Sequence, residues 1–268
     1  MEEITLVVWA ASIACVILVG IAKAGFAGGI GVVAVPLLCL VMPPSKAVAI
    51  LLPVLCACDV VSIFFYRRIV SWEKVRELFP GALAGILLAA VFLWLWTGDE
   101  AATERGLKIL VGFLALLFVF YQGARAWIFQ RIERYHPAAW HGALCGLATG
   151  FTSAIAHAGG PPVTMYLLPQ HMDRRLFVGT TVWLFTFINA AKLLPYYLLG
   201  LFSAENLAMS LSLLPAVPFG VCAGVWLNRR LEQGLFVKVV YAILFLTGVQ
   251  LVTGWDPIGA AAALLGAG

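Results

Sequence analysis

The division of this chain into long apolar runs, separated by short charged or Pro/Gly-containing breaks, most constrains its fold. A transmembrane helix needs about 20 mostly apolar residues, and eight runs are long enough. Two others, 29–42 and 161–170, are too short and follow glycine-rich breaks, so we expect re-entrant segments or halves of broken helices. The eight long runs cover residues 4–22, 46–66, 77–97, 106–128, 138–156, 176–199, 206–227 and 235–253.

Composition excludes most soluble classes of protein. Hydrophobic residues make up 63% of the 268 residues and charged residues 11%, whereas soluble domains average about 45–50% and about 25%. So few charged side chains cannot surround so much apolar material in water, which argues against a soluble enzyme, a nucleic-acid binder or a disordered chain. The sequence predicts an all-α, polytopic helical membrane protein with eight to ten spans in one integral membrane domain.

The basic residues indicate the orientation, because short cytoplasmic loops are enriched in Lys and Arg. The loops on the opposite side carry Asp99, Glu100, Glu104 and Glu205. We therefore expect both termini outside, on the periplasmic side of a bacterial inner membrane. The basic residues that can all be cytoplasmic at once are Arg67, Arg68, Lys74, Arg76, Arg125, Arg131, Arg134, Arg174, Arg175, Arg229 and Arg230.

The two halves of the chain align with each other at an offset of about 130 residues. Each half, 1–130 and 131–268, crosses the membrane an odd number of times in the orientation above, so homologous halves must be oppositely oriented. This predicts an inverted-topology repeat, with a site near mid-depth where broken helices meet. The aligned pairs include Gly28 with Gly159, Gly29 with Gly160, Asp59 with Asn189, Pro80 with Pro215, and Gly85 with Gly220.

The first glycine-rich break is a candidate anion site. Lys23 directly precedes it, and Gly25, Gly28 and Gly29 lie within it. Glycine lets the backbone approach a ligand closely, and a half-helix that starts near Gly28 would turn free N–H groups toward an anion. The alternative is that Lys23 is a stop-transfer lysine at the membrane interface.

The second break is also a candidate site, with His157 in front of Gly159, Gly160 and Pro161. Proline suits the first turn of a helix, so we expect a helix start here. Ser153 lies four residues before His157 on the same face. This histidine could bond an anion or carry the proton that drives transport; alternatively, it packs against a backbone carbonyl.

Three further polar residues lie within apolar runs, where an ionisable side chain costs at least about 2.5–3.5 kcal/mol. Asn189 and Lys192 share a helix face and could line a polar path. Lys192 also lies four residues before Tyr196, so it could instead extend to the interface. Asp59 is far from either end of its run. It could form an ion pair with a lysine or carry a coupling proton.

The two breaks, in their order and spacing, resemble those of the TauE/SafE family of sulfite exporter-like membrane proteins. The matching features are G-F-x-G-G-x-G-x-x-x-x-P from Gly25 to Pro36 and the Gly-Gly-Pro from Gly159 to Pro161. The resemblance covers residues 4–253 and implies a bacterial inner-membrane permease for sulfite, sulfonates such as sulfoacetate, or related organic anions. The second break departs from the first, because Pro161 and Pro162 replace Ile30 and Gly31.

We therefore expect a secondary transporter that exports a small anion by alternating access, with Asp59 or His157 as a carrier of coupling protons. An anion channel, a membrane enzyme and a structural subunit are the alternatives. The four histidines have no metal-ligand spacing and there is no P-loop, so no cofactor, metal or catalytic residue is expected. The expected partners are the anion and the lipid bilayer, with a homodimer as an open option and no nucleic acid.

Overall fold

The computed structural model describes residues 6–25, 31–96, 99–130, 138–230 and 234–255, and these residues form helices without a strand. The prediction of an all-α fold is confirmed for this part of the chain. The helices are α1 (Leu6–Gly25), α2 (Ala34–Leu38), α3 (Pro44–Tyr66), α4 (Trp72–Leu95), α5 (Glu100–Gln130), α6 (Ala139–Ala156), α7 (Gly160–Leu167), α8 (Arg174–Leu198), α9 (Ala204–Leu213), α10 (Ala216–Arg230) and α11 (Gly234–Thr253), with 3-10 turns at Gly31–Val33 and Leu168–Gln170.

Five of these helices are long and apolar enough to cross a membrane, namely α1, α3, α4, α5 and α8. A sixth span exists if α9 and α10, which meet at a 48° bend, are counted together. The expected eight spans are therefore not confirmed. α6 covers nearly all of the predicted run 138–156 but contains threonines, Ser153 and His141, and it is not among the helices apolar enough to span. The apolar part described for α11, Lys238–Thr253, is shorter than a full span. Both predicted short segments are indeed short helices, α2 and α7.

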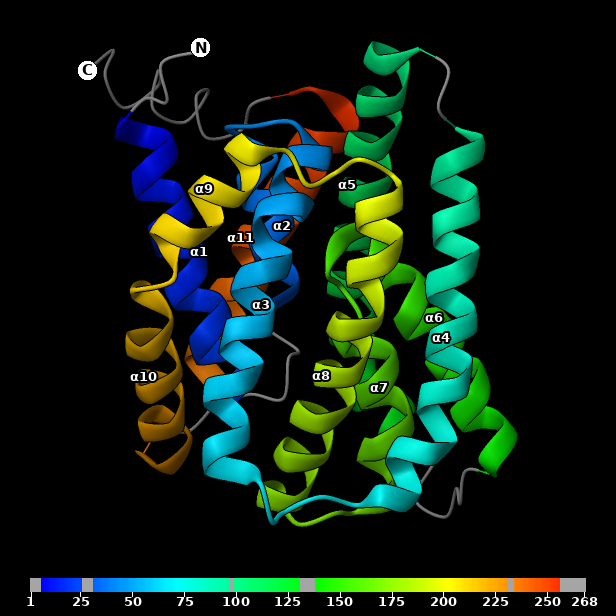
Figure 1. The fold of residues 1–268 in the computed structure, drawn as a ribbon. Coiled ribbons are helices and arrows are strands. Elements are labelled where there is room, and N and C mark those ends of the chain that lie inside the picture. The colour runs from blue at the N-terminus through cyan, green and yellow to red at the C-terminus, as the bar shows by residue number, and fades with distance from the viewer. Residues whose placement is uncertain (1–5, 26–30, 97–98, 131–137, 231–233, 256–268) are drawn as a thin grey trace, which may run out of the picture.

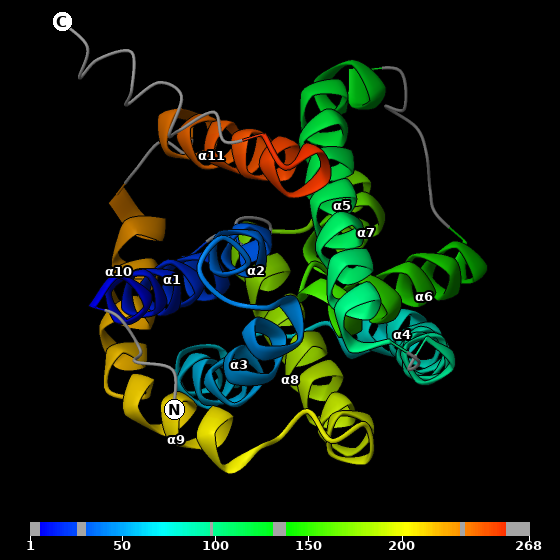
Figure 2. The same cartoon turned by 90° about the horizontal axis from the view of Figure 1, so that it is seen from above.

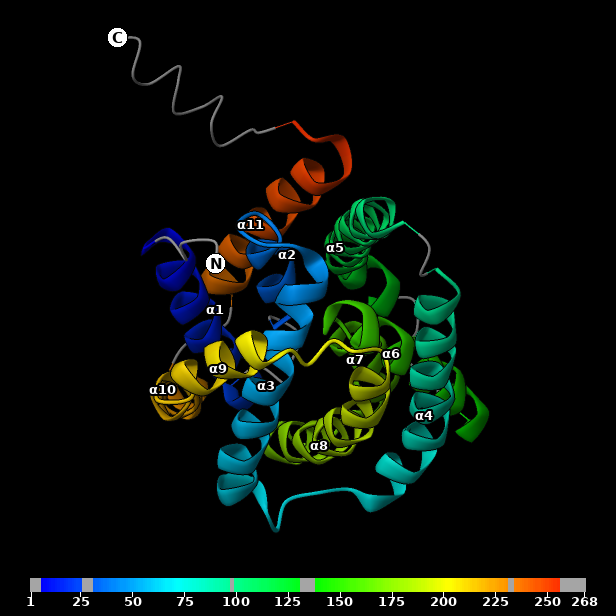
Figure 3. The same cartoon turned by 45° about the horizontal axis from the view of Figure 1, so that its top comes forward.

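The helices form a bundle around α3 and α8, which pack against each other in its middle (Figures 1 and 2). On one side α1 packs along α10, and on the other α4 lies along α6 (Figure 3). Glycines allow both close contacts: a Cβ at Gly150 on α6 would collide with the Ala82 carbonyl of α4, and one at Gly20 on α1 would lie 2.7 Å from the Gly220 carbonyl carbon of α10. Small residues at helix interfaces are the usual means of close packing in membranes.

The two ends of the bundle differ in charge. We call the end with the starts of α3, α5 and α9 and the end of α8 the upper end, as in Figure 1, and the opposite one the lower end. The exposed arginines of the α3–α4 connection, the first turns of α4 and the start of α8 all lie at the lower end. The upper end carries Asp99, Glu100 and Glu205, all exposed.

Candidate functional site

The centre of the site is a contact between Asp59 on α3 and Asn189 on α8. Asn189 Nδ2 donates a 2.7 Å hydrogen bond to Asp59 Oδ2. Both residues are buried, with 1% and 2% of their surfaces exposed. These residues were aligned with each other between the two halves of the sequence, so equivalent positions meet where the two central helices pack.

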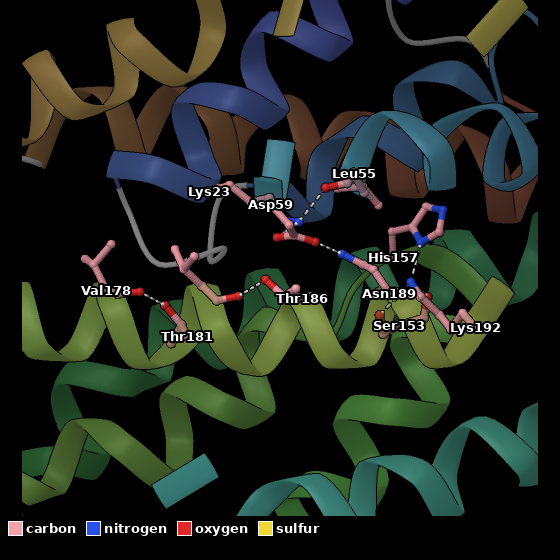
Figure 4. Close-up of polar contacts among 11 residues, drawn as sticks. Lys23, Leu55, Asp59, Ser153, His157, Val178, Thr181, Thr186, Asn189 and Lys192 are labelled. Carbon is pink, nitrogen blue, oxygen red and sulfur yellow. Dashed lines mark hydrogen bonds and ion pairs between the residues drawn. The ribbon is translucent and has the colours of Figure 1, made fainter. Parts of the chain in front are cut away.

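Lys23 completes the first part of the site from the end of α1. Its ammonium group forms an ion pair with Asp59 Oδ1 and donates a 3.0 Å hydrogen bond to the Leu55 carbonyl of α3. The expected ion pair between Asp59 and a lysine is therefore present (Figure 4). Because Lys23 is only 8% exposed and bonded inward, the alternative of a stop-transfer lysine at the interface is wrong.

Lys192 forms the second part of the site, one turn beyond Asn189 on α8. It is fully buried, which excludes the alternative that it extends to the interface. Its Nζ bonds the Ser153 carbonyl at 3.1 Å, Ser153 Oγ at 3.0 Å and His157 Nδ1 at 2.9 Å (Figure 4). Ser153 lies in the last turn of α6, where the helix dipole favours a cation. The hydrogen-bond partners of Lys192 Nζ are thus neutral groups, in contrast to the carboxylate beside Lys23.

His157 links this part of the site to α3. It follows α6 in the left-handed backbone conformation, with φ of 50°, which is uncommon for residues other than glycine. Its Nε2 lies 2.9 Å from the Val48 carbonyl. Because a carbonyl only accepts hydrogen bonds, Nε2 carries a proton. Nδ1 of a neutral ring is then the acceptor for the Lys192 ammonium.

The buried cluster contains two lysines and one carboxylate, so it carries an excess of positive charge when both lysines are protonated. Lys23 is paired with the Asp59 carboxylate, and the hydrogen bonds of His157 fit a neutral ring. A buried charge without a counter-charge is costly in a low-dielectric interior. The cluster is therefore suited to accept an anion beside Lys192.

A cavity of about 30 Å³ adjoins the cluster. This volume is enough for a bound water, so the site contains little empty space. Five of the residues proposed from the sequence lie in the cavity wall, and Asp59 and Lys192 bond to members of that wall. The lining consists of Val19, Lys23, Gly31, Ala34, Leu51, Leu55, Ser153, His157, Gly160, Phe185 and Asn189.

The two glycine-rich breaks are less alike than the sequence suggested. Gly25 is the last residue of α1, whereas Gly28 and Gly29 lie outside the described residues. No helix begins between Gly31 and Val33 except a 3-10 turn, and α2 starts only at Ala34. The expected half-helix start near Gly28 thus lies outside the described residues, and the first described turn after it is the 3-10 turn at Gly31–Val33, which leads directly into α2.

At the second break a helix does begin, as Pro161 predicted, because α7 starts at Gly160. However, Pro161 and Pro162 have no N–H group, which leaves Gly159 and Gly160 as the backbone donors of this turn. Gly159 is also required by packing, since a Cβ there would lie 2.9 Å from the Thr149 side chain. The second break thus offers fewer N–H donors to an anion than a free helix start.

The alternative that His157 packs against a backbone carbonyl is present in the structure, with Val48 as the acceptor, although no sequence pattern identifies which residue supplies it. One contact of the site was not predicted. Tyr196, four residues after Lys192, is buried, and its hydroxyl donates a 2.6 Å hydrogen bond to the Ala154 carbonyl of α6. Its spacing from Lys192 places it on the same helix face, which could have indicated this role.

Comparison with known proteins identifies one relationship. The family model described as "Sulfite exporter TauE/SafE" matches residues 12–251 of the chain. No curated protein and no solved structure matches this chain at a significant level.

Proposed function

Because the chain belongs to the TauE/SafE sulfite exporter family, whose members are membrane transporters, we propose that it is a secondary transporter for a small anion. The substrate class is sulfite, a sulfonate or a related organic anion, moved across a bacterial inner membrane by alternating access. The site residues are those of the buried cluster, with Lys192 as the principal anion-binding group and Ser153, His157 and Asn189 as the polar groups that orient the anion.

The observation that carries this proposal is the difference in charge balance within the cluster. Lys23 already has the Asp59 carboxylate, whereas the fully buried Lys192 bonds to the two oxygens of Ser153 and a histidine nitrogen. An anion that enters the adjoining cavity would supply the missing negative charge. An oxyanion suits this position because its several acceptor oxygens match the ammonium, hydroxyl and amide donors around the cavity.

We also propose the inverted repeat, with residues 1–130 and 131–268 as its halves. In two places, a helix of the first half packs against the corresponding helix of the second half, and the two helices run antiparallel. A two-fold axis perpendicular to such a pair requires this antiparallel direction. In α3 and α8, Asp59 contacts Asn189 while Tyr66 clusters with Val178. In α5 and α11, a Cβ at Gly112 would meet Leu251, and one at Gly248 would meet Leu116.

The remaining close pairs support the same symmetry, because they exchange equivalent helices. In the proposed repeat, α1 of the first half corresponds to α6 of the second, and α4 of the first half corresponds to α9–α10 of the second. The contact between α4 and α6 should therefore have a symmetric counterpart between α10 and α1. Both pairs exist, and both are parallel. Along α4, Gly81 and then Gly85 approach successive turns of α6, and along α10, Gly220 and then Gly224 approach successive turns of α1.

The coupling proton is best assigned to His157 and Lys192 together. The ring and the ammonium share one short contact, so a proton on Nδ1 would replace that hydrogen bond with repulsion between two cations. The charged groups nearest the ring are Lys192 of α8, with Lys23 of α1 and Asp59 of α3 further away in the same cluster. Asp59 remains the second candidate, since its protonation would break the ion pair with Lys23.

The orientation is that expected from the basic loops, with the lower end in the cytoplasm and both chain termini in the periplasm. The exposed arginines at the lower end support it, because positive loops are retained on the cytoplasmic side. Export would then carry the anion from the lower end to the upper end.

Flux measurements in proteoliposomes test the function. We expect uptake or exchange of sulfite or sulfoacetate from a panel that also contains taurine and carboxylates, and a dependence on an imposed pH gradient. Transport of cations alone would contradict the proposal. A steady current that needs no exchange or gradient coupling would favour the anion channel instead.

Lys23→Met and Lys192→Met, made singly, test the site. Lys192→Met is expected to weaken the apparent affinity for the transported anion by removing a binding group, and Lys23→Met by leaving the buried Asp59 carboxylate unpaired near the anion. Equal amounts of inserted protein in both variants are the control. Unchanged kinetics in both variants would remove these lysines from the site.

A further inference from the structure

A second and larger cavity lies between the central site and the upper end of the bundle. Its volume is about 360 Å³. It is enclosed by the starts of α3 and α5 and the ends of α4, α6 and α8, and we call it the upper chamber. Among the residues that line it are Ser45 and Val48 of α3, Glu100 and Glu104 of α5, and Ile155 of α6.

The upper chamber and the central cavity lie along one face of α3. Ser45 and Val48 line the chamber, while Leu51 and Leu55 line the central cavity. These residues follow each other at intervals of three or four, which places them on one side of a helix. The next residue at this spacing is Asp59. The two cavities are therefore stacked along the helix that also carries the buried carboxylate.

The partition between the two cavities includes His157. Val48 lines the chamber, and its carbonyl accepts a hydrogen bond from Nε2 of His157, which lines the central cavity. On α6 the same division recurs, since Ser153 lines the central cavity whereas Ala154 and Ile155 line the chamber. The histidine ring thus joins α3 to the end of α6 at the level where the two cavities are separated.

The contacts that hold the His157 ring can also be broken by a conformational change. Its left-handed backbone costs free energy that the surrounding contacts must offset. Those contacts come from different halves of the chain: Val48 belongs to α3, and Lys192 to α8. A relative movement of α3 and α8, or an anion that attracts Lys192, would weaken the bonds that hold the ring.

We infer that the upper chamber is the upper part of the anion's path and that His157 is the gate between it and the central site. This inference rests on the proposed function. Opening breaks the hydrogen bond from His157 Nε2 to the Val48 carbonyl and joins the two cavities. The charged residues that line the chamber are Glu100 and Glu104. Because they repel anions, the chamber is a passage in which the anion does not bind tightly, from either side.

Labelling of single cysteines tests the chamber. In the full chain with its six native cysteines replaced by alanine, Ser45→Cys places a thiol in the chamber wall. We expect a membrane-impermeant, sulfonate-bearing thiosulfonate added at the upper side to modify it and to remove most of the flux. Ala101→Cys is the matched control, because Ala101 is exposed at the same end and does not line the chamber; its modification should leave the flux unchanged.

The gate is tested with Leu51→Cys, whose side chain lines the central cavity and is 1% exposed. We expect this thiol to be protected when His157 is intact and to react from the upper side in His157→Asn. Asparagine tolerates the left-handed backbone but is too short to reach Val48. His157→Gln, which keeps an amide donor at the length of the ring, should preserve the protection.

If His157→Asn does not insert, the same thiol in the intact protein should become reactive when anion is present on both sides and transport is turning over. Equal protection in all of these states would overturn the gate. Full anion flux in the Ser45→Cys variant after complete modification of its thiol would show that the chamber is not part of the path. Absence of any anion flux in the unmodified protein would instead contradict the proposed function, whatever the labelling pattern.

Discussion

The two buried lysines of this protein belong to one cluster but have different surroundings. Lys23 from α1 is joined to the Asp59 carboxylate, whereas Lys192 on α8 is held by Ser153 and His157, which are neutral in the arrangement described here. A paired buried charge mainly keeps its partner satisfied. A buried cation held by dipoles alone keeps the capacity to bind a charged ligand. The comparison therefore separates a structural lysine from a ligand-binding one within a single cluster.

The largest expected effect comes from removing the carboxylate. Asp59→Asn leaves two buried lysines without a counter-charge, and breaking such a pair costs about 3–5 kcal/mol. Denaturant titration of the purified protein in detergent micelles should show this loss. A variant as stable as the parent would mean that Asp59 is not the structural partner of Lys23.

Removing both members of the pair sharpens the same comparison. Lys23→Met combined with Asp59→Leu replaces the pair with apolar side chains, which is often close to neutral for stability. Because the cluster then still contains Lys192, we expect the double variant to retain anion transport. Loss of anion affinity in a stable double variant would show that Lys23 binds the anion directly.

Lys192→Met should have the opposite profile. It removes the cation without leaving a carboxylate unpaired, so stability should change little. A hydrogen bond to a charged group contributes about 1.5–3 kcal/mol, so the apparent affinity for the anion should fall at least about tenfold. Initial rates of proteoliposome flux over a range of anion concentrations measure this. A smaller loss than in the Lys23 and Asp59 double variant would reverse the assignment of the two lysines.

A smaller effect is expected at the hydroxyl beside Lys192. Ser153→Ala removes one neutral hydrogen bond, and a loss of about 1 kcal/mol corresponds to about fivefold in affinity. Ser62→Ala is the matched control. Ser62 Oγ is buried on α3 near Asp59 and has no hydrogen-bond partner within the described structure, so its removal should leave anion affinity unchanged. Equal losses in the two variants would indicate a general packing effect.

The smallest effect is expected for an ion pair outside the cluster. Lys46 at the start of α3 contacts Glu205 at the start of α9 at 2.6 Å, and the Glu205 side chain is 63% exposed. Exposed pairs contribute less than about 1 kcal/mol and weaken with salt. Unfolding of Lys46→Ala should therefore differ little from that of the parent, least of all at high salt. A large loss would show that burial does not account for the contrast with Lys23 and Asp59.

Sequence reasoning recovered the members of the cluster better than their roles. Lys23, Asp59, Asn189 and Lys192 stood out because ionisable and polar side chains are costly inside apolar runs, and the structure brings all four together. The number of spans was harder to predict. α6 is one helix over its predicted run but contains polar residues and is not among the helices apolar enough to span, whereas a bend between α9 and α10 divides a run that is continuous in the sequence.

What the sequence determined by itself was the class of fold and the identity of the buried polar residues, because apolar length, helix breaks and the cost of an isolated charge are all local properties. The tertiary structure alone decided which lysine meets the carboxylate and where the upper chamber lies. Those outcomes depend on how α1, α3, α6 and α8 approach one another. The spacing of residues within one helix does not determine which side chain of another helix they meet.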